Sequence, residues 1–184
     1  ASQRGLIKHF TAIADAVSIP NMLYNVPSRT GVNIAVDTYK ELAKHPNITA
    51  VKEASGNMDT VMQLSAYTDL DIYSGNDDEA LCCLALGGKG LISVSSNVVP
   101  REKHDEIVLF LDGRHDEALE IQKKLLALDK ALFMDVNPIP VKEALNIMGF
   151  KAGECRLPLC SMTDEMIAKL RAVMEPLGLV GCVK

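Results

Sequence analysis

The sequence predicts an α/β fold in which strands and helices alternate up to about residue 112, followed by an all-helical tail. Short apolar runs of strand length, such as 21–25 and 48–52, are separated by segments whose apolar residues recur at helical spacing. Beyond Pro100 no convincing strand remains. We therefore expect two parts: residues 1–100 with four β/α steps, and a helical region over 101–184.

The first part begins with an amphipathic helix over about 5–17, where Leu6, Phe10 and Ile13 share one face. A proline pushes the residue before it out of the helical region, so the next helix ends before His45-Pro46. The turn 87–90, rich in glycine, separates the last strand from the helix before it. We expect strands at 21–25, 48–52, 71–74 and 91–94, with helices at about 35–44, 57–67 and 77–86 between them.

The second part reads as four helices, at about 101–112, 114–134, 138–148 and 163–177. Pro138 and Pro140 stand at the start of the third helix, where a missing N–H costs little. Ser161 and Thr163 precede the fourth and are plausible N-caps.

Composition narrows the class of protein. The chain has 184 residues, 48% of them hydrophobic, and a net charge of −5, which suits one soluble, well-packed domain. Lys and Arg are scattered and aromatic residues make up only 4%, so we expect no nucleic-acid binding. No apolar run approaches the roughly 20 residues that span a bilayer. Residues 1–4 do not form a signal peptide, and we expect a cytoplasmic protein without membrane contact.

The five cysteines do not suggest a disulfide framework or a zinc site. Cys82 and Cys83 lie in an apolar helical run and are expected to be small core residues. Cys155, Cys160 and Cys182 lack the close Cys/His pairing of a zinc site. We expect five reduced thiols and no metal. The four histidines are isolated and are expected to be solvated or capping residues: His9, His45, His104 and His115.

A lysine, Lys52, ends one of the predicted buried strands. Desolvation lowers the pKa of a lysine, and a neutral amine is the form that attacks a ketone to give a Schiff base. A strand-end lysine that reaches solvent, or that pairs with the neighbouring Glu53, explains the same residue. Because parallel strands end at the same side of a sheet, Lys52 and Tyr24 are expected to share one site.

Tyr24 and Arg29 are the other reactive side chains at this predicted edge. A phenol can donate and accept a proton in turn, and a guanidinium can hold a carboxylate by two hydrogen bonds. A half-buried tyrosine with a satisfied hydroxyl, and a solvated loop arginine, are the plainer interpretations. Gly75 would let backbone groups approach a small ligand, although an N-cap by Asn76 or Asp77 explains the same turn. Ile92 and Ser93 end the last strand and would line the pocket.

Five motifs along almost the whole chain resemble the dihydrodipicolinate synthase family of pyruvate-dependent class I aldolases. They are Tyr24-Asn25-Val26-Pro27-Ser28-Arg29-Thr30-Gly31, Val51-Lys52-Glu53-Ala54-Ser55-Gly56, Ser74-Gly75-Asn76-Asp77, Gly87-Gly88-Lys89-Gly90-Leu91-Ile92-Ser93-Val94 and Asn137-Pro138-Ile139-Pro140-Val141-Lys142. Within the superfamily, Arg29 favours the synthase over N-acetylneuraminate lyase. A related aldolase with another aldehyde acceptor stays open.

The resemblance implies a lyase of lysine (diaminopimelate) biosynthesis that condenses pyruvate with aspartate semialdehyde. It implies that Lys52 forms the Schiff base, that Tyr24 relays protons and that Arg29 receives the carboxylate of the aldehyde. Gly75 and Ile92 match pocket positions that act through their backbones. It further implies a homo-oligomer, and no metal or organic cofactor, because the lysine itself is the electron sink.

The resemblance also implies a (β/α)8 TIM barrel with a helical C-terminal extension, of which the sequence supplies only the last four β/α units. A barrel of this kind takes roughly 250 residues. Strands 21–25 and 91–94 would then be unpaired edges. We expect self-association, complementation by a separate N-terminal half, or part of a larger protein. The competing hypothesis is a catalytically silent half-barrel that serves as an oligomerisation or interaction module.

Overall fold

A computed structural model describes residues 1–183, which divide into two compact units. Unit 1, Ala1–Ile92, contains every strand of the described residues, and unit 2, from Ser93 onward, is helical. The change from α/β to all-helical structure that the sequence predicts is therefore confirmed. Each unit has a hydrophobic core of its own.

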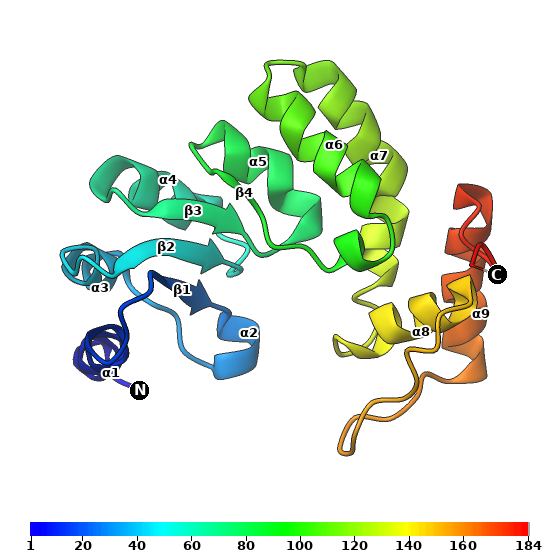
Figure 1. Ribbon diagram of the computed structural model, residues 1–184, viewed down its shortest axis with the longest axis horizontal. Helices are drawn as coiled ribbons and strands as arrows, with labels where there is room; N and C mark the ends of the chain where they lie inside the picture. Colours follow the sequence, from blue (N-terminus) through cyan, green and yellow to red (C-terminus); the bar gives the residue numbers. More distant parts are fainter. Residues whose placement is uncertain (184) are drawn as a thin grey trace. The chain divides into compact units, whose positions relative to one another are not determined.

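Unit 1 is built on a parallel four-stranded sheet in which the strands stand in chain order, β1-β2-β3-β4 (Figure 1). The strands are β1 Asn21–Asn25, β2 Ile48–Glu53, β3 Asp71–Ser74 and β4 Gly90–Leu91. All four were expected, but the fourth was predicted too long, at 91–94. Ile92 N–H still donates to the carbonyl of Ser74, at 2.9 Å, and beyond it the chain turns into a short 3₁₀ segment, so the ladder ends.

The helices of unit 1 alternate with its strands as predicted, with boundaries within a few residues. They are α1 Gln3–Asp15, α3 Val36–Leu42, α4 Met58–Tyr67 and α5 Ala80–Ala85, the last preceded by the 3₁₀ turn η1 Asp77–Glu79. Helix α2, Pro27–Thr30, was not predicted, because four residues are too few to show a helical period. Gly31, with φ of 68°, ends α2 in the left-handed conformation that glycine adopts without strain.

The two faces of the sheet have different surroundings because side chains alternate along a strand. Leu23, Val51 and Ile72 are buried on one face, in a cluster with residues of α1, α3 and α4. On the opposite face Met22 and Tyr24 remain 43% and 45% exposed. The polar residues of the site lie on this second, less covered face.

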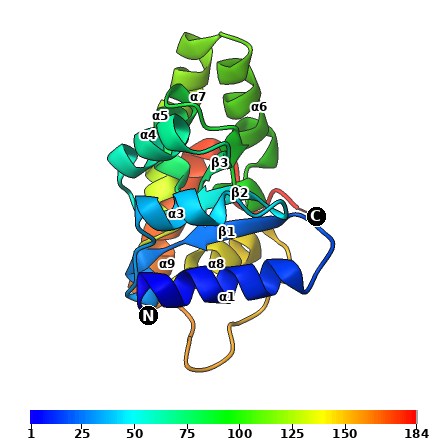
Figure 2. The ribbon, with the colours of Figure 1, turned by 90° about the vertical axis from the view of Figure 1, so that its left-hand side faces the viewer.

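Helix α1 is attached to the rest of unit 1 by side-chain amides near both its ends. The Oε1 of Gln3 accepts hydrogen bonds from the N–H of Ala35 at 3.0 Å and the hydroxyl of Thr38 at 2.7 Å. The Nδ2 of Asn47 donates to the carbonyl of Ala14 at 3.2 Å. Helices α1 and α3 consequently lie side by side (Figure 2).

Unit 2 contains the four predicted helices: α6 Pro100–Leu111, α7 His115–Ala131, α8 Ile139–Met148 and α9 Asp164–Met174. Short 3₁₀ turns, η2 Ser95–Asn97 and η3 Glu175–Leu177, were not predicted as separate elements. The predicted N-cap Thr163 is confirmed, since its side chain accepts a hydrogen bond from the N–H of Met166 at 3.3 Å. Leu125, Leu128 and Leu170 are among the fully buried core residues.

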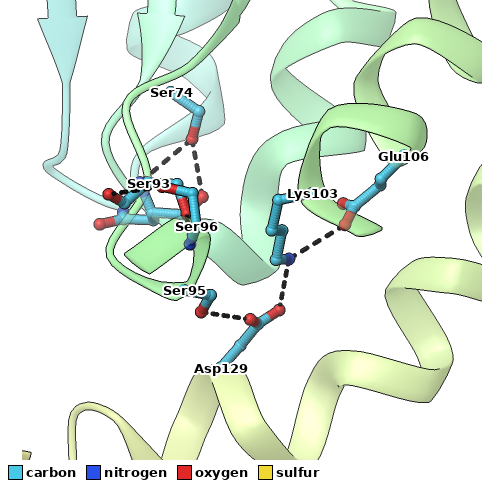
Figure 3. Close-up of polar contacts among 8 residues, drawn as sticks. Ser74, Ser93, Ser95, Ser96, Lys103, Glu106 and Asp129 are labelled. Carbon is cyan, nitrogen blue, oxygen red and sulfur yellow. Dashed lines mark hydrogen bonds and ion pairs between the residues drawn. The ribbon is translucent and has the colours of Figure 1, made fainter. Parts of the chain in front are cut away.

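A charged cluster lies in the interior of unit 2 (Figure 3). The Nζ of Lys103 donates to Oδ2 of Asp129 at 2.8 Å and to Oε2 of Glu106 at 3.0 Å, and the hydroxyl of Ser95 donates to Oδ1 of Asp129 at 2.6 Å. The three charged side chains are at most 2% exposed. Burial acts to lower the pKa of Lys103, but the hydrogen bonds and charges of Asp129 and Glu106 outweigh it and raise that pKa.

All five cysteines, Cys82, Cys83, Cys155, Cys160 and Cys182, are free thiols. Cys83 is a core residue as expected, but Cys82 is exposed, so that part of the prediction is wrong. The reason is geometric, since consecutive residues of a helix point about 100° apart and only one of the pair faces the core. Among residues 1–183, no helix is both long enough and apolar enough to cross a membrane.

Candidate active site

The carboxyl ends of β1, β2 and β3 bring three side chains together. Tyr24 is the register partner of Lys52, and Lys52 is the register partner of Tyr73. The Nζ of Lys52 lies 4.5 Å from the centroid of the Tyr24 ring. The structure therefore places Tyr24 and Lys52 in one site, as the strand-end positions predict.

The surroundings of Lys52 favour its neutral form. Burial is the largest effect and lowers the pKa of Lys52, the charge of Asp77 opposes this, and the charge of Arg29 lowers the pKa further. Lys52 and Glu53 are consecutive residues of β2, so their side chains point to opposite faces of the sheet and are not placed to form an ion pair. An amine that loses its proton more readily than an ordinary lysine is a better nucleophile toward a carbonyl carbon.

Arg29 reaches this edge from the loop that follows β1. It lies in α2, whose first turn is fixed by the hydrogen bond from Arg29 N–H to the carbonyl of Val26 at 2.9 Å. The side chain is exposed, as a solvated loop arginine would be, yet its charge acts on Lys52. An exposed guanidinium near a half-buried amine is available to an anionic ligand.

Gly75 follows β3 and allows the Lys52 side chain to pass close to the backbone. The N–H of Gly75 donates to the carbonyl of Glu53 at 2.7 Å. A Cβ at this position would stand 2.5 Å from the Cβ of Ala54 and 3.1 Å from the Cε of Lys52. Ile92, half-buried, extends the ladder beside Gly75 through its N–H. The absence of a side chain at Gly75 is therefore required by the packing of Ala54 and Lys52 around it.

The alternative of a helix cap by the side chain of Asn76 is not what the structure shows. Asn76 occupies the N-cap position of η1, but its side chain does not cap, and its Nδ2 donates to Oε2 of Glu79 at 2.7 Å. The hydroxyl of Ser74 accepts instead from the N–H of Asn76, at 3.2 Å. Asp77, the first residue of η1, is 1% exposed.

The sequence did not reveal that Asp77 and Glu53 are buried acidic side chains close to Lys52. Asp77 was considered only as a cap and Glu53 only as a partner of Lys52, whereas both are buried and the charge of Asp77 acts on the amine. A signal existed for Glu53. It alternates with the apolar Val51 on the buried face of a strand, and a charged residue at such a position requires partners.

The site offers donors, acceptors and a nucleophile. Among residues 1–183, no group of three or more His, Cys, Asp or Glu side chains is placed to hold a metal ion. Lys52 can add to a carbonyl, Tyr24 has a phenol that can exchange protons and a ring 4.5 Å from that amine, and Arg29 can hold an anion. This set of groups suits covalent chemistry on a carbonyl compound that carries an anionic group.

Comparison with known proteins identifies the family. A family model described as the dihydrodipicolinate synthetase family matches residues 1–177. A curated relative named 4-hydroxy-tetrahydrodipicolinate synthase, from Caldicellulosiruptor saccharolyticus, is 53% identical over 97% of this chain and 61% of its own length. A protein of the same name from Acetivibrio thermocellus is 47% identical with the same coverage.

Solved structures agree with the family model. The crystal structure of dihydrodipicolinate synthase from Aquifex aeolicus matches with a TM-score of 0.95 and 43% identity, over 98% of this chain and 62% of that chain. The synthase from Thermotoga maritima matches with a TM-score of 0.94 and 38% identity, over 98% and 63%. The expected fold class is confirmed as part of a (β/α)8 barrel with a helical C-terminal extension.

The chain thus spans about three fifths of the length of the curated relatives it matches. Nearly all of its own residues take part in these matches. This chain belongs to the dihydrodipicolinate synthetase family.

Proposed function

We propose that this chain carries the Schiff-base half of a 4-hydroxy-tetrahydrodipicolinate synthase site, in which Lys52 binds pyruvate for condensation with aspartate semialdehyde. The observation that carries the proposal is the Lys52 amine at the carboxyl end of β2, 4.5 Å from the Tyr24 ring and with a lowered pKa. The names of the relatives, at 53% and 47% identity, support the same reaction. A cytoplasmic location and a homo-oligomer are proposed on the same family resemblance.

The reaction begins with the neutral amine of Lys52, which adds to the keto carbon of pyruvate. Loss of water gives a protonated Schiff base, and this iminium acts as the electron sink, so that no organic cofactor is required. A proton then leaves the methyl carbon to give the enamine. The enamine carbon attacks the aldehyde carbon and forms the new carbon–carbon bond. Cyclisation by the amino group of the condensed aldehyde releases the Lys52 amine.

Three other residues have roles in this scheme. Tyr24 is the proposed proton relay, because its phenol ring lies against the reacting amine. Arg29 is the proposed anchor for the carboxylate of the aldehyde, and its exposed position agrees with a ligand that arrives from solvent. Gly75 and Ile92 are proposed to shape the pocket by their backbones, since a side chain at Gly75 would collide with Ala54 and crowd Lys52.

The test is reductive trapping. The chain is incubated with pyruvate, reduced with borohydride and digested, and the modified peptide is identified by mass spectrometry. We expect modification at Lys52 in the unaltered chain and none at position 52 in Lys52→Arg. Lys89→Arg is the matched control, because Lys89 precedes β4 at the opposite end of the sheet and should leave trapping unchanged. A folded chain whose Lys52 stays unmodified would contradict the proposal.

An oligomerisation or interaction module is the second candidate function. It is favoured by the edge position of β1, which among the described strands pairs with β2 alone, and by Met22 and Tyr24, each more than two fifths exposed. Thermal stability measured with and without pyruvate distinguishes the two functions. A chain that binds pyruvate gains thermal stability from it, whereas a silent module gains none.

A further inference from the structure

Glu53, directly after Lys52 on β2, is a buried carboxylate held by neutral donors. It is 4% exposed. The Nδ2 of Asn25 donates to its two oxygens at 3.1 and 3.0 Å, the hydroxyl of Tyr39 donates to Oε2 at 3.0 Å, and the N–H of Ser55 donates to Oε1 at 2.7 Å. Because all of these partners donate, the ionised form of Glu53 fits the cluster.

The effect of this charge is visible on neighbouring groups. Burial, then the charge of Glu53 and the hydrogen bond to it, raise the pKa of Tyr39. Burial and then the same charge raise the pKa of Cys83 to about 11. A buried charge without an opposite partner is costly unless hydrogen bonds hold it, so the geometry of these donors is strongly constrained.

The cluster joins the two strands that carry the site. Asn25 is the register partner of Glu53, just as Tyr24 is the register partner of Lys52 one residue earlier. Asn25 is itself fixed, because its Nδ2 also donates to Oδ1 of Asn33 at 2.8 Å. The side-chain bonds between Asn25 and Glu53 therefore hold the two strand ends together on the face opposite to the site.

We propose that Glu53 is a positioning residue, which fixes the separation of Tyr24 and Lys52 through its hydrogen bonds to Asn25, Tyr39 and Ser55. This inference rests on the proposed Schiff-base function of Lys52. Glu53 does not touch the substrate, since its side chain lies on the helix-covered face of the sheet. A misplacement of about 1 Å at reacting atoms can cost roughly 100-fold in rate, so a group that maintains this separation affects the chemistry from a distance.

The main comparison is between Glu53→Gln and Glu106→Gln. Both replace a glutamate that is at most 4% exposed, but Glu106 belongs to the charged cluster of unit 2 and not to the site. Two rates are measured on each folded variant: reductive trapping at saturating pyruvate, and acetylation of Lys52 by acetic anhydride across a range of pH, with Lys89 as the internal reference. Acetylation requires only the free amine and reports the surroundings of Lys52 whether or not pyruvate reacts.

We expect Glu53→Gln to slow trapping about 10-fold and to move the pH midpoint of Lys52 acetylation upward. The reason for the upward shift is that a loosened strand end admits water, and burial is the main cause of the lowered pKa of Lys52. Asp77, Arg29 and Tyr24, the other groups around the amine, are unchanged in this variant. Loss of the Glu53 charge would by itself lower the pKa of Lys52, but Glu53 lies on the opposite face of the sheet and is not among the groups that shift this pKa. Glu106→Gln should lose stability and leave both the trapping rate and the midpoint as they are.

Tyr39→Phe is the second variant, and it tests the positioning role of Glu53 if Glu53→Gln does not fold. It removes one donor to Glu53 and keeps the ring in the core, so we expect trapping to slow two- to threefold and the midpoint to move in the same direction. Unchanged rate and midpoint in folded variants at Glu53 and Tyr39 would overturn the inference. An equal loss of rate in Glu106→Gln would also overturn it, since the cause would then be general destabilisation.

The inference and the proposed function fail in different ways. If pyruvate leaves no label on Lys52 in the unaltered chain, the proposed function fails. The acetylation midpoints then still show whether Glu53 controls the surroundings of Lys52. If pyruvate labels Lys52 in the unaltered chain and equally fast in Glu53→Gln, the function stands and the positioning role is wrong.

Discussion

The two units bury charge in opposite ways. In unit 2 the Lys103 amine lies between two carboxylates, Glu106 and Asp129, at 3.0 and 2.8 Å. In unit 1 the Glu53 carboxylate has no cation as partner among the described residues and is held by an amide, a phenol and a backbone N–H. Hydrogen bonds and Coulombic attraction together compensate burial in the first cluster, and hydrogen bonds alone do so in the second.

The difference indicates what each cluster is for. Ion pairs tolerate some movement, because the attraction between charges varies slowly with distance. Hydrogen bonds to a lone carboxylate depend strongly on distance and angle, and they fix the groups that make them. The cluster around Glu53, which depends on the geometry of its hydrogen bonds, lies beside the site in unit 1. The cluster that depends on charge, around Lys103, joins α6 to α7 in unit 2.

The largest expected effect comes from Lys103→Met. This change leaves Glu106 and Asp129 buried without their cation, and breaking a buried pair from one side costs about 3–5 kcal/mol. We expect a loss of this size in the free energy of unfolding, measured by urea denaturation and circular dichroism. A loss below about 1 kcal/mol would mean that the charges of unit 2 do not carry its stability, and the comparison would fail.

Tyr39→Phe tests the other cluster through stability. The variant removes a hydrogen bond to a buried charge, and such bonds contribute about 1.5–3 kcal/mol. We expect a loss in this range in the same urea measurement, smaller than for Lys103→Met because the amide of Asn25 still reaches both oxygens of Glu53. A neutral result would show that the phenol is not needed to hold the carboxylate.

Alkaline pH should weaken both clusters, and the two variants separate their contributions. The pKa of Lys103 is raised in the folded chain, so its stabilisation is complete below pH 10.5 and is lost as pH rises through the folded value. Tyr39 also keeps its proton in the folded chain above its ordinary pKa of 10.0, so unfolding becomes easier above that pH.

Each group contributes a slope of up to about 1.4 kcal/mol per pH unit. We expect the unfolding free energy to fall above pH 10 in the unaltered chain and to fall less steeply in Lys103→Met and in Tyr39→Phe. Urea denaturation at intervals between pH 9 and pH 12 measures this. Identical slopes in all three proteins would contradict the pKa shifts on which the comparison depends.

The smallest effect is expected at an exposed ion pair. Lys169 and Glu165 on α9 lie 2.7 Å apart with most of each side chain in solvent. Such i,i+4 pairs contribute about 0.3–0.5 kcal/mol. Lys169→Met should therefore change the unfolding free energy by no more than this, which makes it the reference against which the buried lysine of unit 2 is judged.

Much of the fold could be predicted from local pattern. Short apolar runs located β1, β2 and β3, and the period-3.6 spacing of apolar residues located all the long helices. Pattern failed where few residues are involved. The helix α2 has four residues, and β4 has two where four were predicted, because pairing with a neighbour and not apolar content decides where such a strand ends.

The candidate site, like the fold, could be predicted only in part. Lys52 and Tyr24 were predictable because strand ends of a parallel sheet converge, and the structure brings them together. The hydrogen bonds of Glu53 could not be predicted, because they come from Asn25 and Tyr39, which are 28 and 14 residues away along the chain. Spacing along a strand shows which face a side chain occupies. It does not show which distant donors reach it.

The order of the strands has a consequence for synthesis of the chain. The strands follow one another across the sheet as they do along the sequence, so β2 pairs with β1 and β3 pairs with β2. Each new strand can therefore dock on an edge that has already left the ribosome, after a short helical connection. The Tyr24–Lys52 pair can form as soon as β1 and β2 are made. The backbone of Gly75 packs beside the Lys52 side chain only after β3 has been added.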